Sequence, residues 1–136
     1  MVIDASVVLN WYLADEAYSH AALELLDRYI SNEVEFSAPS LLEHEVLNGL
    51  MIAKKRGRIE QEKVRMAVEG FLGLEIEQQY ISSFFPKVVY FSETYSLSAY
   101  DASYLAVADE EGIEFITADQ DLYTKVKKDL EWVKWI

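Results

Sequence analysis

Short apolar segments alternate along this chain with longer segments in which apolar residues recur at helical spacing. The expected strands are residues 2–3, 34–38, 74–76, 114–117 and 132–135, and the expected helices are 5–13, 17–30, 40–57, 59–72, a segment from Pro86, 98–112 and 119–127. Residues 78–85 are ambiguous. Strands that alternate with helices pair in parallel through right-handed crossovers. We therefore predict an α/β fold, a three-layer sandwich in which helices flank a central, mostly parallel sheet.

Length and composition predict a single domain over residues 1–136. Of the 136 residues, 51% are hydrophobic, and there are only 5 Gly and 2 Pro, which is typical of one compact globular unit. No apolar run approaches the roughly 20 residues that span a bilayer, so no membrane association is expected. A signal peptide would begin with a basic segment, and none precedes Val2. We expect a cytoplasmic protein.

The charged and metal-binding residue types restrict the chemistry. Cysteine is absent and the 2 histidines, His20 and His44, lack a metal-ligand spacing, so any metal should be a hard cation bound by oxygen. The net charge of −12 argues against an extended basic surface for nucleic acid. Two local basic clusters could still contact phosphates, or could be solvated helix ends: Lys54, Lys55, Arg56 and Arg58, and Lys125, Lys127 and Lys128.

Three aspartates are expected at one edge of the sheet. Asp4 and Asp119 each follow a predicted strand, and ligand sites in parallel sheets lie at the carboxyl ends of the strands. Asp101 opens a helix that runs antiparallel to the next strand and so begins at the same edge. Taken singly, Asp4 and Asp119 could be simple N-caps, and Asp101 could be only the acidic partner of Ser98 in a capping box. Carboxylates gathered in one place repel one another, however, unless they bind a divalent cation, and an oxygen-only ligand set favours Mg²⁺ or Mn²⁺.

A fourth acid is expected on the helix over residues 40–57, where two glutamates compete. Glu43 fits a capping box with Ser40, a structural role that contributes on the order of 1 kcal/mol. Glu45 instead shares its helix face with Leu41, Gly49 and Ile52. A charge on such an apolar face needs compensation, which a cation would provide. Glu45 is therefore the preferred ligand.

Around these acids the chain resembles the PIN-domain nucleases, and among them the VapC-type toxins of prokaryotic toxin–antitoxin systems. The matching segments are residues 2–9, 39–50, 100–108 and 115–119, each of which holds one of the four acids. In the first, a strand ends on Asp4 and a hydroxyl follows at Ser6. In the second, Glu45 directly precedes a valine and lies three residues before Asn48, which again selects Glu45. The four segments occur in the order of the family and extend over nearly the whole chain.

The resemblance implies a Mg²⁺- or Mn²⁺-dependent endoribonuclease with a small antitoxin protein and a second copy of the chain as partners. The implied catalytic and metal-binding residues are Asp4, Glu45, Asp101 and Asp119, and Asp121 is a nearby acid that could assist or replace Asp119. Residues expected to orient these acids or the substrate are Ser6, Asn48 and Thr117. The residues expected to contact phosphates of the RNA are Lys54, Lys55, Arg56 and Arg58.

Two other function classes are compatible with acids at this edge of a sheet. A phosphoacceptor or phosphatase domain also places aspartates at the carboxyl edge of a parallel sheet, but it requires a second acid close to the first. Here Ala5 and Ser6 follow a lone Asp4, which disfavours that class. A catalytically silent PIN-like interaction module is the other alternative, and metal-dependent RNA cleavage would distinguish it from the enzyme.

Overall fold

The computed structural model describes residues 1–13, 15 and 17–136. In this part of the chain, five strands form one parallel sheet, in the order β3-β2-β1-β4-β5. The strands are short: β1 (Val2–Ile3), β2 (Ser37–Pro39), β3 (Glu77–Gln79), β4 (Phe115–Thr117) and β5 (Val133–Trp135). The predicted α/β sandwich is confirmed, with a sheet that is parallel throughout.

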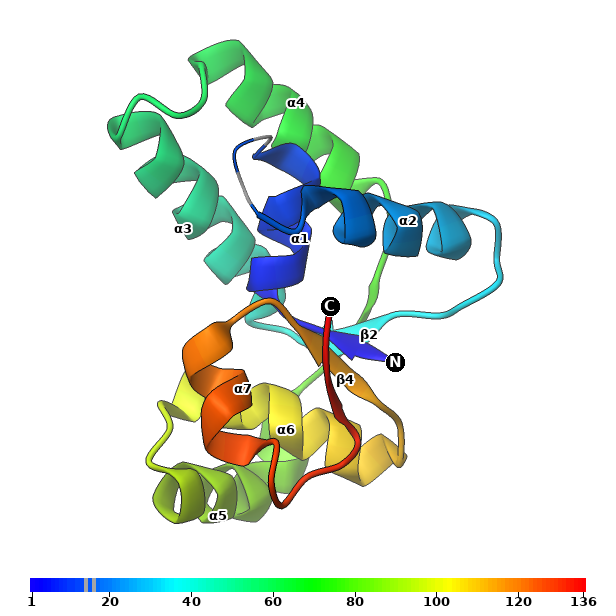
Figure 1. Ribbon diagram of the computed structural model, residues 1–136, viewed down its shortest axis with the longest axis vertical. Helices are drawn as coiled ribbons and strands as arrows, with labels where there is room; N and C mark the ends of the chain where they lie inside the picture. Colours follow the sequence, from blue (N-terminus) through cyan, green and yellow to red (C-terminus); the bar gives the residue numbers. More distant parts are fainter. Residues whose placement is uncertain (14, 16) are drawn as a thin grey trace.

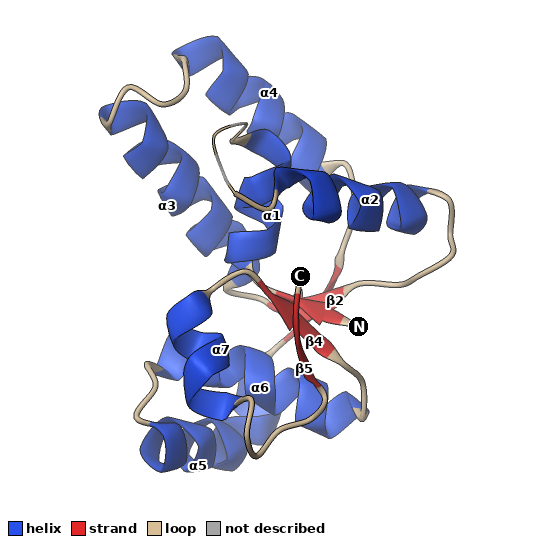
Figure 2. Cartoon of the chain, viewed as in Figure 1, coloured by secondary structure: helices blue, strands red, loops and turns tan. Residues whose placement is uncertain are grey.

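Helices cover both faces of this sheet (Figures 1 and 2). One layer contains α1 (Ala5–Tyr12), α2 (Ser19–Ile30), α3 (Leu42–Lys55) and α4 (Gln61–Leu72). The other contains α5 (Phe85–Tyr95), α6 (Ala99–Glu111) and α7 (Gln120–Val126), and the short 3₁₀ helix η1 (Ile81–Phe84) leads into α5. Among the described helices, none is both long enough and apolar enough to cross a membrane.

The order of the strands places a switch point beside β1. The chain moves outward from β1 to β2 and β3 through the first helical layer, then crosses to β4 and β5 through the second. β1 and β4 are therefore neighbours although they are distant in sequence, with Ile3 paired to Ile116. Loops that leave two such strands diverge to opposite faces, which opens a crevice at the carboxyl edge.

The core is densest where α6 lies over the middle of the sheet. Seven consecutive residues of α6, Ala102 to Ala108, are buried, and small side chains let the helix lie close to the strands. The ring of Tyr104 is stacked on that of Phe115 in β4, with centroids 5.9 Å apart. On the opposite face the rings of Trp11, Tyr29 and Phe36 form a second stacked group. Both helical layers are thus anchored to the central strands.

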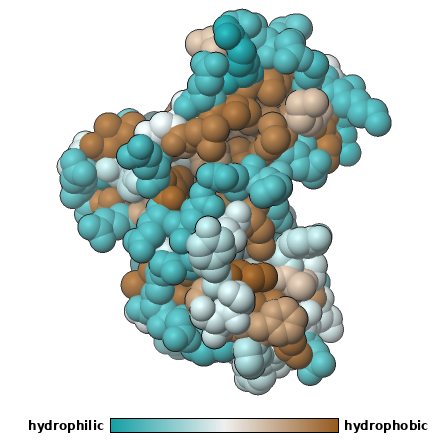
Figure 3. Space-filling model, turned by 180° about the vertical axis from the view of Figure 1, so that it is seen from behind, coloured by the Kyte–Doolittle hydropathy of each residue, from teal (hydrophilic) through white to brown (hydrophobic). Residues whose placement is uncertain are grey.

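An apolar surface extends over the hairpin of α3 and α4 (Figure 3). A groove of about 200 Å³ is lined by side chains of both helices, including Val46, Leu47, Val68, Phe71 and Leu72. Leu47 and Leu72 are about half exposed, as are the nearby helical residues Met51 and Met66. Contiguous exposed apolar surface of this kind is typical of a contact site for another macromolecule.

Three local predictions were wrong, two of them for identifiable backbone reasons. The third strand occupies residues 77–79 and not 74–76, because Glu75 has φ 51° and interrupts the extended chain just before it. Ser40 does not cap α3: its backbone N–H donates to the Gln79 carbonyl at 2.9 Å, so it continues the pairing with β3, and the helix begins at Leu42 without a side-chain cap. Sheet pairing therefore overrides the capping-box pattern. The second strand is likewise shifted, from 34–38 to 37–39.

The close contact between α1 and α3 predicts the effect of adding a side chain at Gly49. A Cβ atom at Gly49 would lie 2.5 Å from Cδ1 of Leu9, whereas one at Gly70 in α4 would lie 3.4 Å from the Tyr12 hydroxyl oxygen. Gly49→Ala should therefore lower the free energy of unfolding by about 1 kcal/mol, despite the better helix propensity of alanine. The control Gly70→Ala should raise it by about 0.5 kcal/mol. Urea denaturation measures both, and a stabilised Gly49→Ala would mean that the end of the Leu9 side chain moves aside at little cost.

Candidate metal and active site

Asp4 occupies the innermost position of the site, directly after β1. Its side chain is only 6% exposed and forms the N-cap of α1, where Oδ1 accepts a hydrogen bond from the Val7 amide at 3.2 Å. The hydroxyls of Ser6 and Thr117 donate to Oδ1 and Oδ2, each at 2.5 Å. The pKa of Asp4 is raised to about 6, by burial first and more weakly by the charge of Asp119, against the opposing effect of these hydrogen bonds.

The same two hydroxyls join the end of β4 to the start of α1. Ser6 Oγ accepts from the Ala118 amide at 2.8 Å, and Thr117 Oγ1 accepts from the Asp119 amide at 2.9 Å. Each hydroxyl thus donates to Asp4 and accepts from the chain after β4. Ser6 and Thr117 therefore fix both the carboxylate of Asp4 and the backbone that carries Asp119.

Asp119 and Asp121 lie on the solvent side of this arrangement. Asp119 is the N-cap of α7, and its Oδ1 accepts from the amides of Asp121 and Leu122 at 2.9 and 3.0 Å. Asp121 is exposed in the first turn of the same helix. The cap therefore places Asp119 at the carboxyl edge, close enough to the buried Asp4 for its charge to affect that carboxyl.

Glu45 and Asp101 approach the edge from opposite helical layers. Glu45, in the first turn of α3, is half-buried and accepts a hydrogen bond from the Tyr104 hydroxyl. Burial raises the pKa of Glu45, the Tyr104 hydrogen bond lowers it, and the charge of Asp101 raises it. Asp101 lies in the first turn of α6, where its amide donates to the N-cap Ser98 and its Oδ2 accepts from the Ser98 hydroxyl at 2.8 Å. The capping interaction predicted at Ser98 is present.

Sequence reasoning missed the residue that connects these acids, Tyr104. Its side chain is 2% exposed, and the pKa of its hydroxyl is well above the usual range because of burial first, then the charge of Glu45 and, more weakly, that of Asp4. The residue looked like one more apolar position of the helix. The available signal was chemical, because a buried tyrosine hydroxyl requires a hydrogen-bond partner and a carboxylate facing the same core provides one.

The four acids form two pairs at one edge. Asp119 affects the titration of Asp4, Asp101 affects that of Glu45, and Tyr104 interacts with members of both pairs. Among the described residues, no three acidic or histidine side chains lie close enough to form a ready-made metal site. The donor set is nevertheless suited to Mg²⁺ or Mn²⁺, since it consists of carboxylate oxygens and includes a buried carboxylate whose ionisation a nearby cation would favour.

Other predicted residues lie further from these pairs. Glu43 accepts a hydrogen bond from the Gln78 amide at 2.6 Å, which gives it a structural partner in β3. Asn48 is exposed on α3, one turn after Glu45. The predicted phosphate-binding cluster lies at the far end of α3 and beyond: Lys55 is ten residues after Glu45, about 15 Å along the axis. Arg58 in that cluster forms a double hydrogen bond with Asp15.

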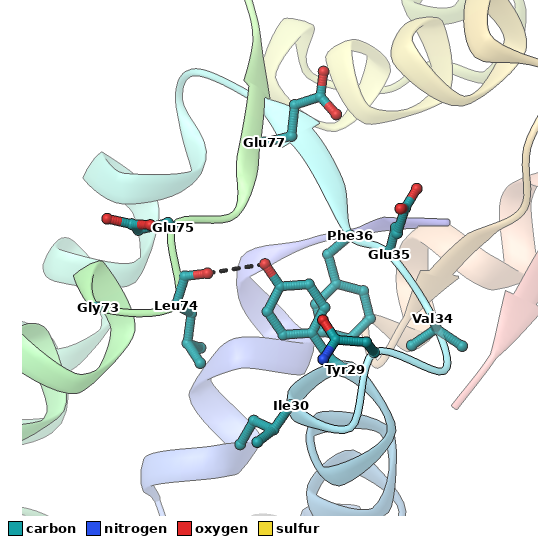
Figure 4. A pocket seen from close by; sticks show the side chains of 10 residues that line it. Tyr29, Ile30, Val34, Glu35, Phe36, Gly73, Leu74, Glu75 and Glu77 are labelled. Atoms are coloured by element: carbon teal, nitrogen blue, oxygen red, sulfur yellow. Dashed lines mark hydrogen bonds between the residues drawn. The ribbon is translucent and has the colours of Figure 1, made fainter.

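A second pocket lies at the opposite edge of the sheet (Figure 4). It has a volume of about 470 Å³ and is formed where the chain enters β2 and β3, with Glu35, Glu75 and Glu77 around it and the Tyr29 hydroxyl bonded to the Leu74 carbonyl at 2.9 Å. Because it lies at the amino ends of the strands, it is separate from the edge that carries Asp4.

The fold and the acid pairs together define a class: a parallel α/β domain with carboxylates gathered at the switch point between β1 and β4. The family model of the PIN domain matches residues 1–128, and the chain belongs to that family. No curated protein matches the sequence.

Two solved structures resemble the fold. PAE2754 from Pyrobaculum aerophilum aligns with a TM-score of 0.70 and 21% identity over 93% of this chain and 85% of that one. The sarcin-ricin loop cleaving toxin VapC20 from Mycobacterium tuberculosis aligns with a TM-score of 0.64 and 14% identity, over 92% of this chain and 94% of that one.

The burial of Asp4 predicts an unusual pH dependence of stability in the metal-free protein. Because the folded pKa of about 6 exceeds the usual aspartate value of 3.8, the folded state binds more protons than the unfolded state between these values. The destabilisation by ionised Asp4 is complete above pH 6 and is relieved as the pH falls towards 4. Between pH 7 and pH 5 the wild type should therefore gain on the order of 1 kcal/mol relative to Asp4→Asn in EDTA. Parallel pH dependences of unfolding in the two proteins would contradict this burial effect.

Proposed function

We propose that this chain is a Mg²⁺- or Mn²⁺-dependent endoribonuclease, with residues 1–136 as its single nuclease domain. The observation that carries the proposal is the buried carboxylate of Asp4, held by Ser6 and Thr117 at the strand switch point with Asp119 beside it. A fold that only needed a helix cap would not bury this acid, because an exposed aspartate caps equally well and avoids the desolvation cost.

The roles of the side chains follow from their anchoring. Asp4, Asp101 and Asp119 would hold the cation, with Asp121 as a further donor at the exposed side. Glu45, aligned by the Tyr104 hydroxyl, would orient the attacking water and accept its proton, for which a raised pKa is favourable. Water attacks phosphorus in line and the P–O bond to the leaving ribose oxygen breaks. When bound, the cation supplies charge neutralisation at the phosphate and activation of the water.

The substrate and partners are proposed from the family and from the exposed surface. VapC20 is a toxin that cleaves the sarcin-ricin loop, and its similarity in fold supports RNA as the substrate class here. The apolar surface on α3 and α4 supports a protein partner, which we propose to be a small antitoxin, and pairing of two copies of the chain. We further propose that the protein acts in the cytoplasm.

Paired substitutions at Glu45 and Glu43 test the proposed active site. Glu45→Gln, Asp4→Asn and Asp101→Asn should each abolish cleavage of total RNA in Mn²⁺, because each removes a charge without changing the volume of the side chain. Glu43→Gln is the matched control on the same helix turn, and it should cut like the wild type because Glu43 is bonded to Gln78. Inactivity of Glu43→Gln together with activity of Glu45→Gln would reverse the assignment.

Thermal unfolding with EDTA and with Mn²⁺ provides a readout independent of cleavage. A ligand that binds only the folded state stabilises it by about 2.7 kcal/mol at a hundredfold excess over Kd. The wild type and Glu43→Gln should gain this stability, and Asp101→Asn should gain much less. Equal gains in all three proteins would exclude a common metal site. Metal binding without RNA cleavage by the wild type would instead favour the silent interaction module.

The basic residues at the tip of the α3/α4 hairpin are proposed to hold a distant part of a long substrate. Since they lie about 15 Å or more from Glu45, a short RNA should not reach both. Joint replacement of Lys54, Lys55 and Arg56 by Ala should weaken binding of a long single-stranded RNA and reduce its salt slope by about 0.7 per lost contact. Binding of a short RNA should be unaffected. An unchanged slope for the long RNA would leave this cluster as a solvated helix end.

A further inference from the structure

An aromatic pocket lies next to the acid site, at the carboxyl edge of the sheet beyond β4. Its volume is about 230 Å³, and its lining consists of Tyr18, Gln120, Tyr123, Thr124, Lys127 and Trp135. Tyr18 and Trp135 meet edge to face, with centroids 5.0 Å apart, and the ring of Tyr123 is 5.4 Å from that of Trp135. Tyr18 is 39% exposed, and the other two rings are partly exposed. The pocket therefore offers aromatic surface to a ligand from solvent.

The pocket and the acids share one scaffold. Gln120 directly follows Asp119, and Trp135 in β5 is paired in register with Thr117, which donates to Asp4. On the other side, the buried amide of Asn10 donates to the Ser6 carbonyl at 2.9 Å and accepts from the Tyr18 amide at 3.2 Å. Asn10 thus ties Tyr18 to the same turn of α1 that holds Asp4. The aromatic walls are fixed relative to the acids from both sides.

The chemistry of the lining matches a nucleotide. Aromatic rings stack with bases of any sequence, and the amide of Gln120 and the hydroxyl of Thr124 are polar groups able to hydrogen-bond a base edge. Lys127 lies at the pocket with Nζ 5.5 Å from the centre of the Tyr123 ring, and Lys128 adds positive charge on the same end of α7. Asp119 and Lys127 are eight residues apart, so a base held here would lie within roughly 12 Å of Asp119 along the helix axis.

We propose that this pocket binds one unstacked base of a single-stranded RNA, at a fixed distance from the phosphate that is cut. The inference rests on the proposed nuclease function and names the part of the substrate that the site would hold. It also explains how an acidic chain can hold RNA close to its carboxylates: aromatic stacking needs no extended positive surface, and Lys127 provides local charge.

The test combines protein variants with RNA that lacks single bases. A short single-stranded RNA of mixed sequence is prepared intact and as a series with one abasic nucleotide at successive positions. Binding is measured by fluorescence anisotropy in EDTA, and KM and kcat in Mn²⁺. One abasic position should weaken binding to the wild type roughly tenfold. Trp135→Leu and Tyr123→Leu should weaken binding of intact RNA by a similar factor and should no longer respond to that abasic position.

Control variants separate loss of the ring from loss of the fold. Tyr123→Phe retains the ring and should bind intact RNA like the wild type. Tyr90→Leu removes an exposed aromatic ring from α5 and should leave the affinity for RNA unchanged. Lys127→Met should weaken binding, whereas Lys63→Met, on exposed α4 surface, should not. If Trp135→Leu unfolds, as judged by circular dichroism, Tyr18→Leu replaces it, since that ring is already part-exposed.

The outcomes distinguish this inference from the proposed function. The base pocket is overturned if the Leu variants bind intact RNA as tightly as the wild type does, or if they still respond to the abasic position. Cleavage of RNA by the wild type in Mn²⁺ would leave the nuclease proposal standing in that case. Absence of cleavage by the wild type refutes the nuclease, and the anisotropy series in EDTA then still decides whether the pocket takes a base. Loss of the abasic effect in the Leu variants alone, with Tyr123→Phe unchanged, supports the inference.

Discussion

The two hydroxyl contacts to Asp4 hold together everything else at the carboxyl edge. A carboxylate that is almost fully buried would destabilise the fold by several kcal/mol if its oxygens had no partners, and Ser6 and Thr117 supply one donor to each oxygen. The same hydroxyls accept from the amides of Ala118 and Asp119, so the geometry of Asp4 sets the direction in which the chain leaves β4. Displacement of either hydroxyl would move the cap of α7 together with the acid.

The electrostatics of the site are governed by burial more than by repulsion. Crowding of carboxylates was the physical reason for expecting a cation, yet desolvation is the largest cause of the raised pKa of both Asp4 and Glu45, and the neighbouring acids contribute less. The difference arises because the four acids form two pairs from separate elements and do not form one closed cluster. Tyr104 bridges the pairs through its contact with Glu45 and through the effect of the Asp4 charge on its hydroxyl.

The sequence was informative where one local rule decided the outcome and uninformative where two competed. Asp4, Asp119 and Asp101 follow from strand ends and helix starts, since topology alone brings those to one edge. Ser40 fits a capping pattern, but its backbone N–H bonds to the Gln79 carbonyl and extends the sheet pairing. β3 is a polar strand at the edge of the sheet, so no apolar pattern marks it in the sequence. Tyr104 acts through a long-range hydrogen bond to Glu45, and Asn10 through side-chain bonds to the backbone of Ser6 and Tyr18; neither leaves a periodic pattern in the chain. The distance from Glu45 to the basic hairpin tip depended on the length and direction of α3, which composition does not reveal.

The contact between Thr117 and Asp4 spans 113 positions of the chain. Such a contact forms only after β4 has paired with β1, and closing a loop of this length carries an entropic cost that local helix contacts do not repay until the sheet is assembled. During synthesis the amino-terminal helices can gather while Asp4 still lacks one of its two hydroxyl donors and Asp119 has not yet been added. The order of elements thus delays completion of the site until the last quarter of the chain has left the ribosome, so that shortened products carry the acids of the first half without the arrangement that joins them.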